Sequence, residues 1–291
     1  MARLLDCDCS PPSPAFPAWA SHGSPSCPLL IALRGSPPAH AGLCILVLCC
    51  LCTPCPLARP GARVIYETDD DNELIGDRTV DDYFLTDPRV ALFGAGQSGG
   101  IALRQATPDM ADCTSSDKVP GACAVNPYAF FGQPSVWPRG YPLNKIGSWP
   151  AIHSTQSGVA VFPAVQQGLA NGDPDVDAIF RLTRKRTDLP IQITFTDSEP
   201  VAIAPFVFTP FNSQNTLFHY SALWGLMIPR TTTFRVCDIW RGYWAQRLLW
   251  ELPAQLSFHP PSVRQIRNPH DYILDYLDER DLYEARQHSH S

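Results

Sequence analysis

The sequence from residue 61 onward predicts an α/β fold, on three observations. Apolar residues make up 45% of the 291-residue chain, which is enough to build a sizeable core. After Gly61, strand-like and helix-like stretches alternate. The β-favouring run Val64-Ile65-Tyr66 stops at an acidic cluster, as a buried strand does when it delivers side chains to its carboxyl end. In open α/β sheets, that end is where ligands bind.

The charge of the chain excludes one class of partner. The formal net charge is −6, and no dense group of Lys and Arg occurs outside residues 181–186. A surface that binds the phosphate backbone of nucleic acids needs a strong positive charge. We therefore expect no nucleic-acid partner.

Residues 1–60 differ from the rest of the chain and form a separate Pro/Cys-rich segment. They contain eight of the eleven cysteines and only five charged side chains, and they show no helical or strand period. We therefore divide the chain into this segment, a folded domain at 61–284, and a disordered tail at 285–291.

Three interpretations of the Pro/Cys-rich segment compete. A membrane anchor is suggested by the apolar run 43–52, but this run is about half of the roughly 20 residues that a spanning helix needs. A metal site is suggested by Cys49, Cys50, Cys52 and Cys55, but no second ligand pair follows nearby. The third interpretation, which we favour, is a mispredicted first exon or translated noncoding sequence joined near Pro60-Gly61.

Helix signals recur later in the domain. Asp173-Pro174 predicts an N-cap followed by proline, opening a helix or turn through residue 180. Asp238 likewise predicts the start of a helix that ends before Pro253, and Asn268-Pro269 predicts the start of the last helix. The Gly-rich stretch 93–100 lacks the ending of a Walker motif, so we interpret it as a mobile surface loop.

The acidic cluster after the first predicted strand indicates a metal site. Three consecutive aspartates repel one another, and a divalent cation would neutralise this repulsion. Asp69 and Asp71 form an Asp-x-Asp pair whose oxygens suit Mn²⁺ or Mg²⁺. Such an ion would balance the charge of a diphosphate leaving group in sugar transfer. Asp-rich turns are also common by chance, whereas an EF-hand is excluded because Ile75 occupies a ligand position.

Several separate blocks of this sequence, in the same order, resemble the STELLO family of Golgi proteins. Two of them are Tyr66-Glu67-Thr68-Asp69-Asp70-Asp71-Asn72 and Trp137-Pro138-Arg139-Gly140, and the others lie in 167–182, 211–216, 238–247 and 270–283. The blocks cover most of residues 61–284.

The resemblance implies a GT-A-like glycosyltransferase domain that uses a nucleotide-sugar donor and a glycan or protein acceptor. It also implies a Golgi membrane location and, from the plant members, association with a polysaccharide synthase complex. Residues 1–60 replace the strands that precede the Asp-x-Asp strand in GT-A domains, so we expect the N-terminal strands to be missing. A non-catalytic scaffold in such a complex is the alternative, and this chain has no convincing full-length transmembrane helix.

Further residues are candidates for binding the substrate. Trp137 could face a sugar ring and Arg139 a phosphate, although a Pro/Gly turn with a packed Trp explains the same residues. Arg181 is a candidate for phosphate. Asp175 and Asp177, with Asp173, could hold the donor or a metal ion, and the capping role of Asp173 is the favoured explanation for that residue.

The last candidates lie near residues 212–241. Asn212, Gln214 and Asn215 have amide groups suited to sugar hydroxyls, or they satisfy one another within a loop. Asp238 could be the catalytic base that takes a proton from an acceptor hydroxyl, and its alternative is the helix N-cap. Arg241 lies one turn further and could pair with Asp238 or with a phosphate.

Overall fold

The computed structural model describes residues 43–45, 64–69, 71–76, 79–85, 100–107, 123–146 and 154–284. Asp70, the Gly-rich stretch before Gly100, most of the Pro/Cys-rich segment and the predicted tail after residue 284 lie outside these ranges.

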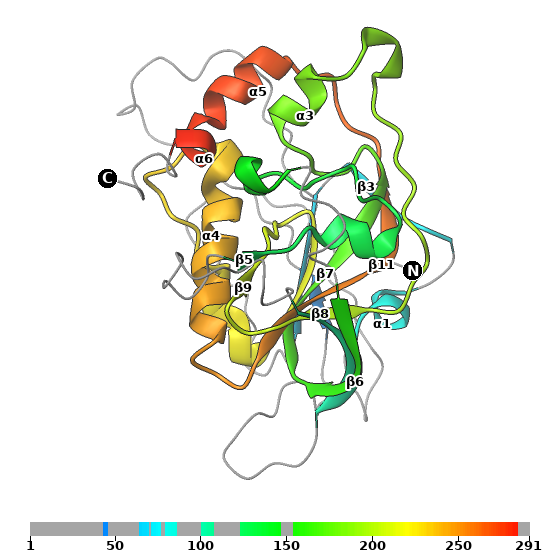
Figure 1. The fold of residues 1–291 in the computed structure, drawn as a ribbon, viewed down its shortest axis with the longest axis vertical. Coiled ribbons are helices and arrows are strands. Elements are labelled where there is room, and N and C mark those ends of the chain that lie inside the picture. The colour runs from blue at the N-terminus through cyan, green and yellow to red at the C-terminus, as the bar shows by residue number, and fades with distance from the viewer. Residues whose placement is uncertain are drawn as a thin grey trace, which may run out of the picture.

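The described residues form two sheets and several helices (Figure 1). The strands are β1 (Leu43–Ile45), β2 (Val64–Thr68), β3 (Asn72–Leu74), β4 (Ile101–Thr107), β5 (Cys123–Ala124), β6 (Ser154–Val161), β7 (Pro163–Gly172), β8 (Val201–Ile203), β9 (Val207–Phe208), β10 (Asn215–His219) and β11 (Gln255–Gln265). The α-helices are α1 (Val80–Tyr83), α3 (Ala178–Leu182), α4 (Phe234–Leu249), α5 (Tyr272–Asp278) and α6 (Arg280–Glu284). The 3₁₀ helices are η1 (Pro127–Phe131), η2 (Leu143–Lys145), η3 (Arg186–Asp188) and η4 (Tyr220–Leu226).

In the part of the chain that the structure describes, nine strands form one mixed sheet. Their order is β1-β2-β10-β7-β11-β8-β4-β6, with β3 paired to β11, and β5 and β9 form a small parallel pair. The α/β class predicted from the sequence is therefore confirmed. The predicted strand Val64-Ile65-Tyr66 is also confirmed, as the first residues of β2.

The directions of the strands decide which loops meet. β10 is antiparallel to both β2 and β7, and β7 is parallel to β11. Consequently β2, β7 and β11 run in the same direction, and their carboxyl ends meet at one edge of the sheet. The amino end of β10 lies at the same edge. This shared edge is called the carboxyl edge below.

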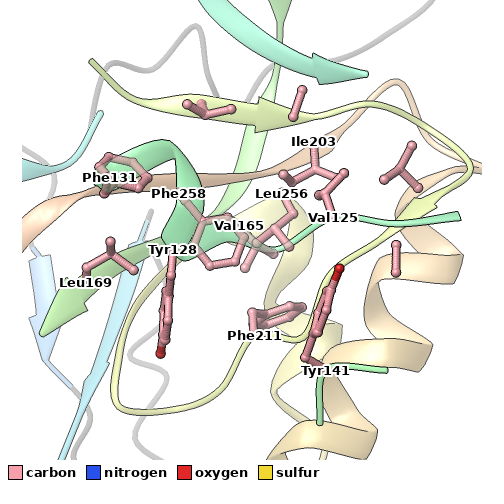
Figure 2. Packing of buried hydrophobic residues seen from close by; sticks show 14 of the residues in the cluster. Val125, Tyr128, Phe131, Tyr141, Val165, Leu169, Ile203, Phe211, Leu256 and Phe258 are labelled. Atoms are coloured by element: carbon pink, nitrogen blue, oxygen red, sulfur yellow. The ribbon is translucent and has the colours of Figure 1, made fainter. Parts of the chain in front are cut away.

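A large apolar cluster holds the centre of the sheet against its helices. Val165 and Leu169 of β7 pack with Leu256 and Phe258 of β11, as Figure 2 shows. Tyr128 and Phe131 of η1 and Phe211 before β10 complete this cluster (Figure 2). Burial of this much apolar and aromatic surface is the main stabilising contribution to the domain.

Helix α4 begins earlier than the sequence predicted. Its N-cap is Thr233, and Asp238 lies inside the helix, so the prediction that Asp238 caps it was wrong. The extra turn forms because Val236 packs into a buried cluster with Ile239 and Leu282. A helix that started at Asp238 would leave this apolar contact unmade.

Two other predicted helix starts were wrong by several residues. Asp177 caps α3 by accepting a hydrogen bond from the backbone of Phe180 at 2.7 Å, and Asp173 does not cap it. The chain stays extended after Asp173 because Val176 is buried and forms a β-bridge with Pro138. The last helix begins after Asp271, whose side chain accepts from two backbone amides, and not at Asn268-Pro269.

In the described ranges, the helices are all too short or too polar to cross a membrane.

Candidate functional site

The candidate site lies at the carboxyl edge of the sheet, where three strand ends deliver polar side chains. Asp69 follows β2, Asp173 and Asp175 follow β7, and β11 ends at Gln265, two residues before Arg267. Because these strands are parallel, the topology itself brings together residues that are almost 200 positions apart in the sequence.

The Asp-x-Asp turn is anchored to the loop before β10. The backbone amide of Asp69 donates to the carbonyl of Gln214 at 3.1 Å, and the side chain of Asn72 donates to the same carbonyl at 2.6 Å. Asp71 accepts a hydrogen bond from the side-chain amide of Gln265 at 3.0 Å. The two carboxylates that were predicted as metal ligands are therefore held by neighbours from β10 and β11.

Asp69 lies in a field of negative charge. Burial, the largest cause, and the carboxylates of Asp71, Asp175 and Asp238 together raise its pKa to about 8, whereas Arg267 opposes this rise. Its side chain is half-buried and accepts no hydrogen bond from the described residues. A cation bound by the Asp69 carboxylate would neutralise the excess negative charge of these neighbouring carboxylates.

These carboxylates fit a divalent cation only in part. No group of three or more His, Cys, Asp or Glu side chains in the described ranges is arranged to hold a metal ion. Asp69 and Asp71 would supply hard oxygen ligands of the kind that Mg²⁺ and Mn²⁺ prefer, and Mg²⁺ is commonly held by one or two carboxylates plus phosphate oxygens of a substrate. The two carboxylates are therefore suitable ligands for Mg²⁺ or Mn²⁺ when phosphate oxygens of a substrate complete the coordination.

Arg139 joins two carboxylates of the site. Its guanidinium donates to both oxygens of Asp175 at 2.9 to 3.2 Å, and its Nη2 donates to Oδ2 of Asp238 at 3.3 Å. Burial alone would raise the pKa of Asp175, but the charge and hydrogen bonds of Arg139 lower it to about 2. Asp175 also accepts from the side-chain amide of Asn212 at 2.6 Å, so it is ionised and fixed.

The two carboxylate oxygens of Asp238 have different hydrogen-bond partners. Oδ2 accepts from Arg139 and from the backbone amide and hydroxyl of Ser213 at 3.3 and 3.4 Å. Among the described residues, Oδ1 accepts from the adjacent backbone amide of Ile239 alone. Gly242 allows this approach of α4 to the 211–213 loop, because a Cβ at that position would collide with the carbonyl oxygen of Phe211.

Arg241 and Arg181 were predicted to bind phosphate, and each forms a buried ion pair. Arg241 pairs with Glu67 at 2.8 to 2.9 Å rather than with Asp238, and neither side chain has significant exposure. Although burial opposes the charge of Arg241, the Glu67 carboxylate keeps its pKa raised. Arg181 pairs with Asp173 at 2.6 Å and donates to the carbonyl of Pro174.

The three predicted amide side chains divide into two groups. Asn212 and Gln214 lie at the carboxyl edge, where Asn212 links Gln167 to Asp175 and Gln214 donates to Gln265. Asn215 is fully buried within the sheet. It accepts from the hydroxyl of Tyr66 at 2.6 Å and donates to Ser262 at 2.7 Å.

Trp137 lies away from these residues and is buried. Its indole nitrogen donates to Asp177 at 2.7 Å, and its ring meets Phe180 edge to face at 4.8 Å. Burial raises the pKa of Asp177 to about 7, against the hydrogen bonds from Phe180 and Trp137.

Sequence reasoning missed Ser213, Gln265 and Arg267. Strand β11 contains Pro260-Pro261, which in a sequence argues against a strand. The structure accommodates the prolines at a register irregularity between His259 and Val263. The one available signal was the alternating Ser-Val-Arg-Gln pattern after the prolines.

Comparison with known proteins gives the family. No protein-family model matches the chain. "Probable glycosyltransferase STELLO1" of Arabidopsis thaliana is 38% identical over 227 residues, 77% of this chain and 27% of that protein. "Probable glycosyltransferase STELLO2" of the same plant is 43% identical over 172 residues, 58% of this chain and 22% of that protein. The chain thus spans about a quarter of the length of these relatives, and over the part that they share it belongs to the STELLO family.

Proposed function

We propose that this domain belongs to a glycosyltransferase that moves a sugar from a nucleoside diphosphate donor to a glycan or protein acceptor. Both relatives are named probable glycosyltransferases, which supports sugar transfer in general. The observation that carries the finer proposal is the meeting of Asp69, Asp71, Asp175 and Asp238 with Arg139 at one sheet edge. The mixed sheet is compatible with a GT-A arrangement, which is part of the proposal.

In this proposal Asp69 and Asp71 would hold Mn²⁺ or Mg²⁺. When bound, the ion would supply positive charge to the diphosphate that leaves as the glycosidic bond breaks. Gln265 fixes the orientation of the Asp71 carboxylate, and Gln214 fixes the backbone of Asp69, so one carboxylate and the turn that carries the other are positioned before any ligand arrives.

Asp238 is the proposed base. In an inverting transfer, the acceptor oxygen bonds to the anomeric carbon as the bond to the diphosphate oxygen breaks, and the hydroxyl proton passes to a carboxylate. Because Arg139 and Ser213 occupy Oδ2 of Asp238, the proton would pass to Oδ1. Arg139 and Asp175 then act as positioning residues for this base.

A Golgi membrane location is the corresponding cellular proposal. Cys123 is engaged in a disulfide bond, and disulfides persist in the oxidising compartments of the secretory pathway. Association with a polysaccharide synthase complex is the proposed partnership.

A non-catalytic scaffold is the second candidate, and one observation favours it. Three of the arginines predicted to meet substrate, Arg139, Arg181 and Arg241, form ion pairs with carboxylates of the chain itself. A scaffold would use this network for stability alone and would bind no donor.

The deciding experiment is a calorimetric titration of the chain with Mn²⁺, followed by uridine and guanosine diphosphate sugars. We expect Mn²⁺-dependent binding of a donor, and we expect Asp71→Asn to abolish it, because this change removes charge but keeps the acceptor for Gln265. Glu73→Gln is the matched control, since Glu73 lies two residues further and is exposed. Donor binding that survives in Asp71→Asn would contradict the metal site, and absence of any donor binding would favour the scaffold.

A further inference from the structure

Four arginines near the carboxyl edge, Arg139, Arg181, Arg241 and Arg267, differ in how closely a carboxylate of the protein pairs with them. Arg139 donates to two carboxylates at 2.9 to 3.3 Å, Arg181 pairs with Asp173 at 2.6 Å, and Arg241 pairs with Glu67 at 2.8 Å. Each of these three has at least one close ionic partner that belongs to the protein. Their charge is therefore already balanced within the fold.

Arg267 is the exception among these four. Its nearest carboxylate oxygen is Oδ1 of Asp173, at 3.6 Å from Nε, which is too far for a hydrogen bond. The same oxygen already accepts from Arg181. The Nε of Arg267 is buried and has no hydrogen-bond partner in the described part of the chain; the same is true of Nε of Arg181 and of Nε and Nη2 of Arg241, but those two side chains are closed off from solvent. A buried donor without a partner costs free energy, and a bound ligand that accepts from it would recover that cost.

Arg267 is also linked directly to the Asp-x-Asp turn. Its Nη2 donates to the side-chain oxygen of Gln265 at 3.2 Å, and the amide nitrogen of Gln265 donates to Asp71 at 3.0 Å. One glutamine therefore sets the position of both the proposed metal ligand and the guanidinium. The side chains of Arg267 and Arg139 are each 11% exposed, whereas those of Arg181 and Arg241 are 1% and 0% exposed. Because Arg139 is already paired with Asp175 and Asp238, Arg267 is the arginine that a ligand can reach without displacing a close ionic partner.

We propose that Arg267 binds the diphosphate of the donor next to the metal held by Asp69 and Asp71. This inference rests on the proposed function and assigns to that site a binding residue that the sequence had not indicated. The departing nucleoside diphosphate gains a further negative charge as the glycosidic bond breaks, which one divalent ion does not neutralise, and guanidinium donates well to phosphate oxygens. The other three arginines cannot take this role without leaving a carboxylate of the protein unpaired and buried.

The test uses the whole chain and two probes, Mn²⁺ alone and inorganic pyrophosphate in the presence of Mn²⁺. We expect Arg267→Gln to weaken pyrophosphate binding by about tenfold or more, the size of one charge-assisted contact. The affinity for Mn²⁺ alone should stay the same or rise, because a neighbouring positive charge is removed. Arg264→Gln is the matched control, since Arg264 is exposed on β11, three residues before Arg267, and it should change neither affinity.

The two affinities should change in different directions, and this separates a binding role of Arg267 from a structural one. If Arg267 only supported the fold, Arg267→Gln would weaken Mn²⁺ and pyrophosphate together, and this result would overturn the inference. Unchanged pyrophosphate affinity would overturn it as well. If the chain failed to bind Mn²⁺ at all, the metal site of the proposed function would fail instead. Should Arg267→Gln unfold, Arg267→Lys keeps the charge and loses the Nε donor, and an undiminished pyrophosphate affinity in that variant would refute the assignment.

Discussion

Two carboxylates only two residues apart, Glu67 and Asp69, have opposite surroundings. Glu67 is sealed inside the domain and paired with Arg241 at 2.8 to 2.9 Å. Asp69 is half-buried at the carboxyl edge, where three other carboxylates raise its pKa and the nearest opposing charge is that of Arg267. Glu67 lies within β2 and Asp69 just beyond its end, so the difference arises because the chain leaves the buried sheet between them. A carboxylate whose charge is balanced belongs to the framework, and one whose charge is unbalanced is available to a ligand.

The largest effect should come from breaking the sealed pair. Arg241→Met keeps most of the side-chain volume but leaves Glu67 buried without its cation. We expect the free energy of unfolding to fall by about 3 to 5 kcal/mol, measured by urea denaturation. The matched control is Arg247→Met on the same helix, because Arg247 pairs with Glu251 at the surface and should cost less than about 1 kcal/mol. Equal losses in the two variants would contradict the distinction between sealed and exposed pairs.

Asp177 sharpens the comparison because it is as deeply buried as Glu67 but contacts no cation. Burial raises its pKa to about 7, above the value of about 3.9 in an unfolded chain. The folded state therefore holds a proton that the unfolded state has lost, and stability falls as the pH rises from about 4 to 7. Ionisation of Asp177 should lower the free energy of unfolding by about 4 kcal/mol between pH 4 and 7.

Asp177→Asn should remove this pH dependence, because the amide cannot ionise and still caps α3 through its oxygen. The measurement is a series of urea denaturations between pH 4 and 8. Asp188→Asn, an exposed residue nearby, serves as the control and should leave the slope unchanged. A wild-type slope that persists in Asp177→Asn would show that another group carries it.

The smallest effect should come from Asp175, which lies two residues earlier and does have a cation. Arg139 overcomes the effect of burial and lowers the pKa of Asp175 to about 2. Its stabilising contribution is therefore present above about pH 4 and is lost as the pH falls through 2. We expect the stability difference between wild type and Asp175→Asn to shrink by about 2.5 kcal/mol between pH 5 and 2. A difference that stays constant would contradict the pairing with Arg139.

The sequence was sufficient for the fold class and for the strand that carries the Asp-x-Asp turn. Both depend on local patterns, namely a β-favouring run and the acidic residues that follow it. The helix starts at Asp173 and Asp238 were wrong because aspartate caps a helix only where tertiary packing permits it. Here Val176 holds one segment extended, and Val236 draws the other helix one turn further.

The site was only partly predictable, for a related reason. The sequence supplied Asp69, Asp71, Arg139 and Asp238 as separate candidates, but it contained no signal that Arg139 joins Asp175 to Asp238. Arg267 was missed because the strand that precedes it contains two prolines. Which arginine lacks a close carboxylate partner depends on distances between strand ends, and these exist only in the folded sheet.

Strand β11 has a further consequence for how this protein is made. In the described sheet it is the one connection between the group β1-β2-β10-β7 and the group β8-β4-β6, and it also pairs with β3. During synthesis, the two groups of strands cannot join until residues 255–265 have left the ribosome. Pairings over such long sequence separations form slowly, so the nascent chain exposes unpaired strand edges to aggregation and to chaperones. The carboxyl edge, which needs Gln265 and Arg267, is consequently among the last parts of the described sheet to form.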